Sequence, residues 1–189
     1  MTEDANTSSY IIRLARSVDI PAIRLMQERS MWVLGGEFYT ANEIASFLTL
    51  FGTMDDAVVE EGHYFVAEDS RGAVLGSGGW TRSRPRYANA NAKAGTQASA
   101  EVPTVRSVFV DPAATRRGVA SAIMSWTERD ALDHGVETLQ LTATLSGVAL
   151  YQKLGYQTEE VTALDLPDQS RFGCVKMRKM IGPMRVQAA

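Results

Sequence analysis

The sequence Val105-Arg106-Ser107-Val108-Phe109-Val110-Asp111-Pro112, followed shortly by Arg116-Arg117-Gly118-Val119-Ala120-Ser121-Ala122, decides the fold of this chain. A run rich in β-branched residues stops at an Asp-Pro turn, a basic turn containing glycine follows, and a helix begins at once. The first turn of a helix presents unpaired backbone N–H groups at the positive end of its dipole, which suits a bound phosphate. We therefore expect a strand, an anion-binding turn and a helix in direct succession.

The turn itself explains how the anion would be held. Gly118 lets the backbone come close to a phosphate, while Arg116 and Arg117 add positive charge for more distant phosphates. The turn alone also fits an ordinary strand-to-helix connection with two solvated arginines. No Lys-Ser or Lys-Thr follows Gly118, and no G-x-G-x-x-G precedes the helix, so a P-loop and a Rossmann turn are both excluded.

A second motif, Leu150-Tyr151-Gln152-Lys153-Leu154-Gly155-Tyr156, lies downstream after another apolar strand and within a short amphipathic helix. Together the two motifs resemble the GCN5-related N-acetyltransferase (GNAT) family, whose acetyl-CoA signature is Gln/Arg-x-x-Gly-x-Gly/Ala. Here the signature reads Thr115-Arg116-Arg117-Gly118-Val119-Ala120. Thr115 departs from the family pattern, so one side-chain contact is expected to be lost while the backbone amide cradle survives.

The resemblance implies an α/β (α+β) fold. Its mixed, mostly antiparallel sheet of about seven strands is flanked by helices, and a splayed fourth and fifth strand pair holds acetyl-CoA. The resemblance also implies cofactor binding by the backbone of the fourth strand, by the glycine turn, and by a residue at the end of the fifth strand where relatives carry Asn. These residues are Val108, Phe109, Val110, Arg116, Arg117, Gly118, Val119, Ala120, Ser121 and Thr144.

Acetyl transfer to an amine needs a polarised thioester carbonyl, an uncharged amine and a proton for the departing thiolate. Tyr151 matches the tyrosine that serves as general acid in many relatives, and a phenol with a pKa near ~10 is protonated at neutral pH. A buried tyrosine that packs the short helix on the sheet is the alternative. No general base is evident: Asp111 reads as a turn residue, and Glu37, Glu101 or a water chain is each consistent with the sequence.

Candidate acceptor-binding residues lie at the base of a long polar loop and between the first two helices. Trp80 and Arg82 begin the loop that spans about residues 81–103, and Glu37 lies in an aromatic, glycine-rich linker over residues 32–39. Solvated arginines and a packed interhelical loop are the simpler readings of the same residues. His134 is expected to end a helix as its C-cap, with only a minor case for catalysis, and His63 at a strand start has little more.

The wider periodicity predicts alternating elements along the chain. We expect strands over residues 10–14, 63–67, 73–80, 103–110, 137–143, from about 156, and over 172–180. Helices are expected to start near Pro21 and after the capping box Thr40-Ala41-Asn42-Glu43, and to span residues 117–133 and 146–154. This order agrees with the GNAT fold over nearly the whole chain.

Composition sets the remaining limits. At 189 residues with 45% hydrophobic residues, the chain is expected to form a single domain with its core over 8–181 and tails at 1–7 and 184–189. A net charge of -3 without long basic blocks argues against nucleic acid or a membrane as partner. The lone Cys174 is expected in the core. The polar N-terminus lacks the apolar region of a signal peptide, so a cytoplasmic protein is predicted. No metal site is predicted.

The leading hypothesis is therefore an acetyl-CoA-dependent N-acetyltransferase acting on a primary amine of a small molecule or a peptide. A non-catalytic acyl-CoA-binding or regulatory module is the alternative, and transfer of a longer acyl group or to a hydroxyl also stays open. Met177, Met180 and Met184 are candidates for homodimer contacts or for core packing.

Overall fold

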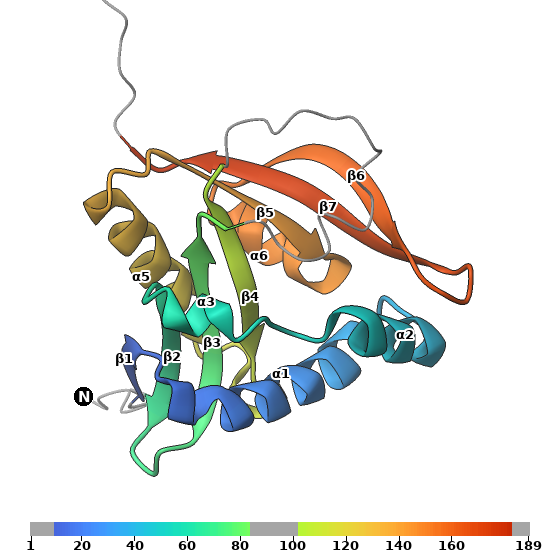
Figure 1. Ribbon diagram of the computed structural model, residues 1–189, viewed down its shortest axis with the longest axis horizontal. Helices are drawn as coiled ribbons and strands as arrows, with labels where there is room; N and C mark the ends of the chain where they lie inside the picture. The colour runs from blue at the N-terminus through green and yellow to red at the C-terminus, as the bar shows by residue number, and fades with distance from the viewer. Residues whose placement is uncertain (1–9, 84–101, 183–189) are drawn as a thin grey trace, which may run out of the picture.

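The computed structural model describes residues 10–83 and 102–182 (Figure 1). Its strands are β1 (Tyr10–Leu14), β2 (Tyr64–Asp69), β3 (Val74–Thr81), β4 (Thr104–Val110), β5 (Thr138–Thr144), β6 (Gln157–Asp165) and β7 (Arg171–Met180). Its α-helices are α1 (Ile20–Gly35), α2 (Ala41–Phe51), α3 (Ala57–Glu60), α5 (Val119–Asp133) and α6 (Val148–Lys153). Short 3-10 turns η1 (Ser17–Asp19), η2 (Pro112–Ala114) and η3 (Leu145–Gly147) precede α1, α5 and α6. The predicted order of elements is confirmed, with α3 and the 3-10 turns added.

The strands form one sheet in the order β1-β2-β3-β4-β5-β7-β6. Neighbouring strands are antiparallel except β4 and β5, which are parallel and share the single register pair Thr104 and Gln140. By contrast, β5 and β7 pair continuously from Thr138 to Thr144. The sheet is therefore mixed and mostly antiparallel, and it splays between β4 and β5, as the resemblance to the GNAT family implied.

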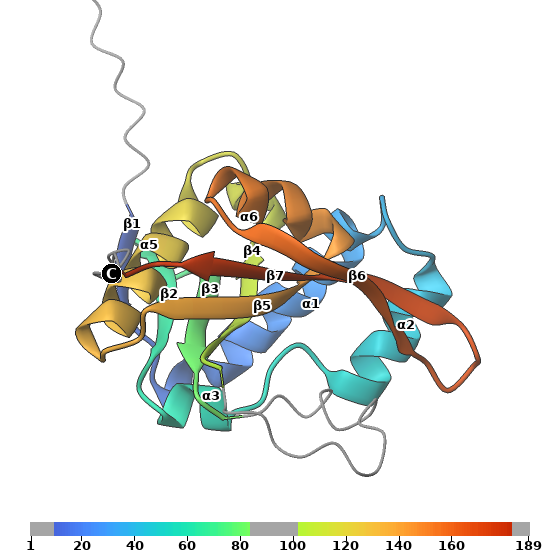
Figure 2. The ribbon, with the colours of Figure 1, turned by 90° about the horizontal axis from the view of Figure 1, so that it is seen from above.

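Helices cover both faces of the sheet, as the strand alternation requires (Figure 2). On β2, Tyr64 and Val66 pack with Ile23 of α1, whereas Ala67 packs with Ile123 of α5 on the other face. Successive side chains of β2 thus point to opposite faces of the sheet, one covered by α1 and the other by α5. The glycines of β3 allow close packing of α5, because a Cβ added at Gly76 would lie 2.8 Å from Val119.

The core residues include two whose roles the sequence left to be decided. Cys174 is 2% exposed, and burial raises the pKa of its thiol to about 11, so the thiol is a core group as predicted. Met177 is fully buried within the β5–β7 core, which confirms core packing for this residue and removes it from any partner surface. Met180 is exposed, and Met184 lies outside the described residues.

Local sequence signals determined the helix ends with one exception. Thr40 caps α2 and exchanges hydrogen bonds with Glu43 in the predicted capping box, and His134 is the C-cap of α5 as expected. The prediction for α1 was wrong at its end, because the helix continues from Met31 to Gly35 through residues assigned to the linker. In the described parts of the chain, no helix has the length and apolar character needed to cross a bilayer.

Candidate functional site

A cavity of about 670 Å³ opens where β4 and β5 diverge. The parallel pair holds together only at Thr104 and Gln140, where the Gln140 side chain donates a hydrogen bond to Thr104 Oγ1 at 3.1 Å. Beyond this point the cavity is lined by α1, the end of β4, the turn before α5, the start of α5, η3 and α6. The splay therefore leaves backbone groups of β4 outside the ladder, facing a space large enough for a ligand.

The turn between η2 and α5 forms one wall of this cavity. Arg116 and Gly118 have φ angles of 63° and 78°, and this left-handed conformation at Gly118 explains the glycine. Gly118 is the N-cap of α5, and no side chain caps the helix at this end. The helix therefore begins with backbone N–H groups that have no intrahelical acceptor, and Val119, Ala120 and Ser121 all line the cavity.

The charge at this end favours an anion. Arg116 is exposed and lines the cavity, and the positive pole of α5 points into the same space. Arg117 is exposed but does not line the cavity. Lys153 at the end of α6 does line it, although the sequence reasoning did not select this residue. Its position two residues after Tyr151 in the second motif was the available signal.

The β4 wall has an irregular backbone that side chains hold in place. Ser107 has a φ of 49°, and the pairing of β3 with β4 shifts register between Ser77 and Gly79. The Ser107 carbonyl accepts a hydrogen bond from Tyr64 Oη at 2.7 Å, and its hydroxyl donates to the Thr53 carbonyl at 2.8 Å. The next residues, Val108 to Val110, which are predicted to bind the cofactor, line the cavity.

A buried polar group supports this bulge from below. Gln27 of α1 is fully buried and donates hydrogen bonds to Tyr64 Oη at 2.8 Å and to Ser77 Oγ at 3.0 Å. Burial raises the pKa of Tyr64 above its usual range, which keeps the phenol protonated as a donor to Ser107. No local sequence signal indicates this network, because its members Gln27, Tyr64, Ser77 and Ser107 come from four separate elements.

Tyr151 lines the same cavity from α6. It is 7% exposed, and its ring meets Tyr156 edge-on with centroids 5.7 Å apart. A Cβ added at Gly147 would lie 3.1 Å from the Tyr151 ring, so the small residue before α6 makes room for the ring. The structure thus brings Tyr151 and the glycine turn to one cavity, although α5 and β5 separate them in the chain.

The two threonines that replace family residues differ in the hydrogen bonds that their hydroxyls make. Thr144 at the end of β5 lines the cavity, and its Oγ1 lies 3.0 Å from Ser146 Oγ. Thr115 also lines it, but its hydroxyl donates to the Pro112 carbonyl at 3.0 Å. The Thr115 hydroxyl is therefore engaged in closing the η2 turn.

Three residues of α1, Ser30, Met31 and Leu34, line the cavity and were missed by the sequence reasoning. They reach it because α1 packs across β3 and β4 and continues one turn further than expected. The sequence indicated a helix that reaches about Met31, but not which cavity the end of that helix would border.

Several predicted acceptor or base residues lie elsewhere. Trp80 is 1% exposed and donates to Asp130, Arg82 donates to the His134 carbonyl at 3.0 Å, and Glu37 is exposed; none lines the cavity. Asp111 accepts from the Ala113 amide at 2.9 Å and pairs with Arg29, which confirms its role in the turn. Glu101 lies outside the described residues.

A second, smaller cavity of about 70 Å³ borders β4 at Arg106 and Ser107. Its other walls come from α2 and the turn after it, and include Phe47, Phe51 and Asp55. Two consecutive residues of β4 therefore border different cavities: Ser107 lines the smaller one and Val108 lines the larger one.

Comparison by sequence matches residues 60–158 to the acetyltransferase (GNAT) domain family. The matched segment covers more than half of the chain and contains β2 to α6, with every part of the large cavity except the α1 wall. No curated protein sequence is significantly similar to the chain.

Solved structures share the fold at low sequence identity. A GCN5-related N-acetyltransferase from Rhodopseudomonas palustris has a TM-score of 0.66 at 16% identity, covering 92% of this chain and 96% of that one. A phosphinothricin acetyltransferase from Sinorhizobium meliloti, in complex with acetyl-CoA, gives 0.59 at 20% identity, with coverage of 92% and 89%. The ribosomal-protein-S18-alanine N-acetyltransferase from Escherichia coli gives 0.60 at 16% identity, with coverage of 96% and 99%.

Proposed function

Because the chain belongs to the GNAT acetyltransferase family, we propose that it moves an acetyl group from acetyl-CoA to a primary amine of a small molecule or a peptide. The observation that carries this proposal is one cavity that contains both the uncapped start of α5 and the ring of Tyr151. A phosphate-binding helix start and a proton donor in one cavity are the two features that transfer from a CoA thioester requires.

The residues present fit acetyl-CoA, the cofactor of this family. The amides of Val119 to Ser121 and the charge of Arg116 would hold the pyrophosphate, with Lys153 on the opposite wall as a further cation. Backbone groups of Val108 to Val110, released from the ladder by the splay, would bind the pantetheine arm. Thr144 would contribute a hydroxyl where relatives carry an amide.

Acetyl-CoA supplies an activated acetyl thioester, and the protein's residues manage position and protons. In the transfer a carbon–nitrogen bond forms and the carbon–sulfur bond breaks. Tyr151 donates its proton to the departing sulfur and regains one from solvent, while the amine loses its extra proton to water. The Val108 amide would stabilise the charge on the acetyl oxygen, because the bulge at Ser107 fixes the backbone direction there.

The smaller cavity beside Ser107 is our candidate for the acceptor amine. It adjoins β4 next to the residues that would hold the acetyl group. Its volume of about 70 Å³ fits a few heavy atoms around the amine rather than a whole bulky acceptor. Similar solved enzymes are named for a small molecule and for a ribosomal protein, so the proposed acceptor includes both small molecules and peptides.

A non-catalytic acyl-CoA-binding module is the second candidate function. It is favoured by Thr115, whose hydroxyl is engaged by the Pro112 carbonyl where the family signature has Gln or Arg. Such a module would keep the amide cradle and bind acetyl-CoA without turnover.

The deciding experiment combines calorimetric titration with acetyl-CoA and a thiol-release screen over small amines and peptides with free N-termini. Transferase activity predicts binding together with CoA release that Tyr151→Phe slows. Binding without release for every amine would support the non-catalytic module. Absence of binding would overturn both candidates.

A further inference from the structure

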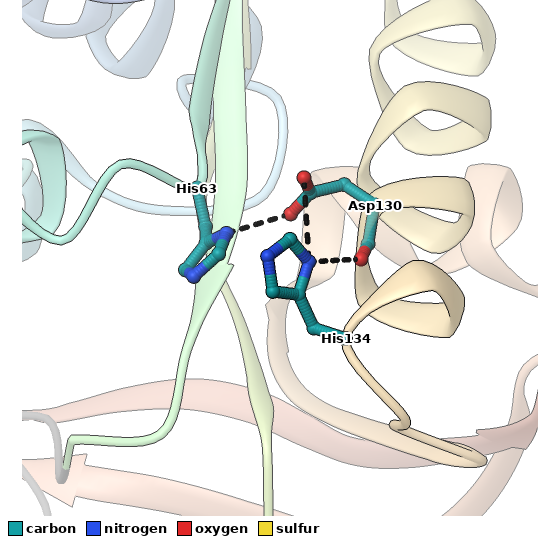
Figure 3. A group of neighbouring side chains, drawn as sticks. All are labelled: His63, Asp130 and His134. Atoms are coloured by element: carbon teal, nitrogen blue, oxygen red, sulfur yellow. Dashed lines mark hydrogen bonds and ion pairs between the residues drawn. The ribbon is translucent and has the colours of Figure 1, made fainter.

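Two histidines and an aspartate converge at the end of α5 that lies away from the acetyl-CoA cavity (Figure 3). His63 precedes β2, Asp130 lies in the last turn of α5, and His134 is the C-cap of that helix. One ligand-type atom from each of the three residues lies within 4.8 Å of the others. The proposed acetyl transfer uses none of them.

The local sequence explains why two of these residues share a face. Asp130 and His134 are four residues apart, so a helix places them on the same side. Gly135, with a φ of 75°, ends the helix immediately afterwards and leaves His134 at its rim. His63 comes from 67 residues earlier in the chain, and its Nδ1 lies 2.8 Å from Asp130 Oδ2.

The hydrogen bonds determine which nitrogen of His134 is available. Its Nδ1 lies 2.7 Å from the Asp130 carbonyl, which only accepts, so Nδ1 carries the proton. The neutral ring then has its lone pair on Nε2, and Figure 3 shows that nitrogen turned towards His63. A histidine whose other nitrogen donates to a backbone carbonyl is the arrangement that metal-binding imidazoles commonly have.

The carboxylate is oriented in the same way. Trp80 Nε1 donates a hydrogen bond to Asp130 Oδ2 at 2.6 Å, and the Trp80 ring stacks on His63 with centroids 4.4 Å apart. Trp80 thus fixes both an imidazole and a carboxylate from within the core. The side chains of His63, Asp130 and His134 are 21%, 22% and 50% exposed, so an ion from solvent has access.

We propose that His63, Asp130 and His134 bind a divalent transition-metal ion of the Zn²⁺ type. Two imidazoles and one carboxylate are a common zinc-ligand set, with ligand distances of about 2.0–2.2 Å and a fourth position for water. Zinc would replace the proton that His63 Nδ1 shares with Asp130 Oδ2, releasing that proton to solvent, and His134 would bind the ion through Nε2. The C-terminal pole of α5 also favours a cation.

The bound ion would connect the segment before β2 to the end of α5 and so stabilise the junction of sheet and helix. Arg82 places a positive charge near the site, which would repel the metal ion. Its guanidinium lies 5.5 Å from the Trp80 ring centroid and donates a hydrogen bond to the His134 carbonyl. We therefore expect Arg82→Gln to bind the ion more tightly than the wild type does.

The test titrates untagged, chelator-treated full-length protein with ZnCl₂ in a calorimeter. One ion per chain is expected, with affinity at least about tenfold lower in His63→Gln and in His134→Gln. Cys174→Ala is the matched control, because its buried thiol is not part of the site, and its affinity should equal that of the wild type. The proposal would be overturned if the wild type binds no zinc, or if both histidine variants bind zinc as tightly as the wild type does.

Thermal unfolding adds a readout that does not depend on the calorimeter. Zn²⁺ at about one hundred times the wild-type Kd should raise the Tm of the wild type by about 5–10 °C, and that of His134→Gln by no more than about half as much. His134 is half-exposed at a helix end, so this variant should fold even if His63→Gln does not. An equal rise in wild type and His134→Gln would place any bound zinc elsewhere.

Discussion

The two ends of α5 have opposite structures. At its start, Gly118 provides no side-chain cap, and the first amides open into the large cavity. At its finish, the His134 ring and the amides of His134 to Val136 return to the last carbonyls of the helix. Every helix begins and ends with unpaired backbone groups, so the difference lies in what satisfies them. An end left without internal partners is suited to a ligand, whereas a closed end holds side chains in place.

The electrostatics of the helix match this division. The positive pole faces the large cavity, the proposed acetyl-CoA site, and the negative pole faces the His63, Asp130 and His134 cluster. One helix of 15 residues thus separates an anion site from a candidate cation site.

The largest effect is expected from closing the open end. Arg117→Glu with Gly118→Asp places two carboxylates at the helix start, and acetyl-CoA affinity should fall at least about hundredfold. Arg117→Gln with Gly118→Asn is the matched control, because it imposes similar backbone strain at the left-handed position without the negative charges. Calorimetry on both folded variants measures the difference. Tight binding by the charged variant would refute the cradle.

The next effect concerns Tyr151, the proposed proton donor, which lines the same cavity as the start of α5. Tyr151→Phe keeps the ring and its contact with Tyr156 but removes the hydroxyl. We expect kcat for acetyl transfer to fall by about 10²-fold or more, while the Kd for acetyl-CoA changes by less than about threefold. Steady-state kinetics and calorimetry give the two numbers. Unchanged kcat would leave Tyr151 with a packing role only.

A smaller effect is expected at the closed end. Asp130→Asn removes the charge that holds His63 and the Trp80 indole, and should lower the free energy of unfolding by about 1–3 kcal/mol. Denaturant unfolding in the presence of a chelator measures this loss. Acetyl-CoA affinity should stay within about twofold of the wild type, since the cavity lies at the other end of the helix. A large loss of affinity would show that the two ends are coupled.

The smallest effect is expected from the support of the β4 bulge. Tyr64→Phe removes the hydroxyl that donates to the Ser107 carbonyl and should cost about 1 kcal/mol of stability. If the bulge positions the Val108 amide, kcat should fall by up to about tenfold with little change in acetyl-CoA affinity. Ser77→Ala is the matched control, because Ser77 contacts the same network without touching Ser107 in the described hydrogen bonds. Equal kcat in both variants would assign Tyr64 to stability alone.

Local signals predicted much of the fold. The β-branched run ending at Asp111-Pro112, the capping box at Thr40 and the glycine at the start of α5 each act through neighbours in the chain. Such signals depend on backbone conformation and nearby side chains, so they can be read without the tertiary structure. The end of α1 was misplaced because the helix continues to Gly35, its last residue, which is buried, so that packing outweighs the weak helix propensity of glycine.

The sequence by itself thus determined the order of elements, the glycine turn before α5 and the candidate proton donor Tyr151. Only the tertiary structure decided which side chains meet. It brought Ser30 of α1 to the cavity, buried Trp80 away from it, and placed His63 against Asp130 across 67 residues of chain. The physical reason is that helix and turn signals act over a few residues, whereas the splay of β4 from β5 and the packing of α1 and α5 arise from contacts between distant segments.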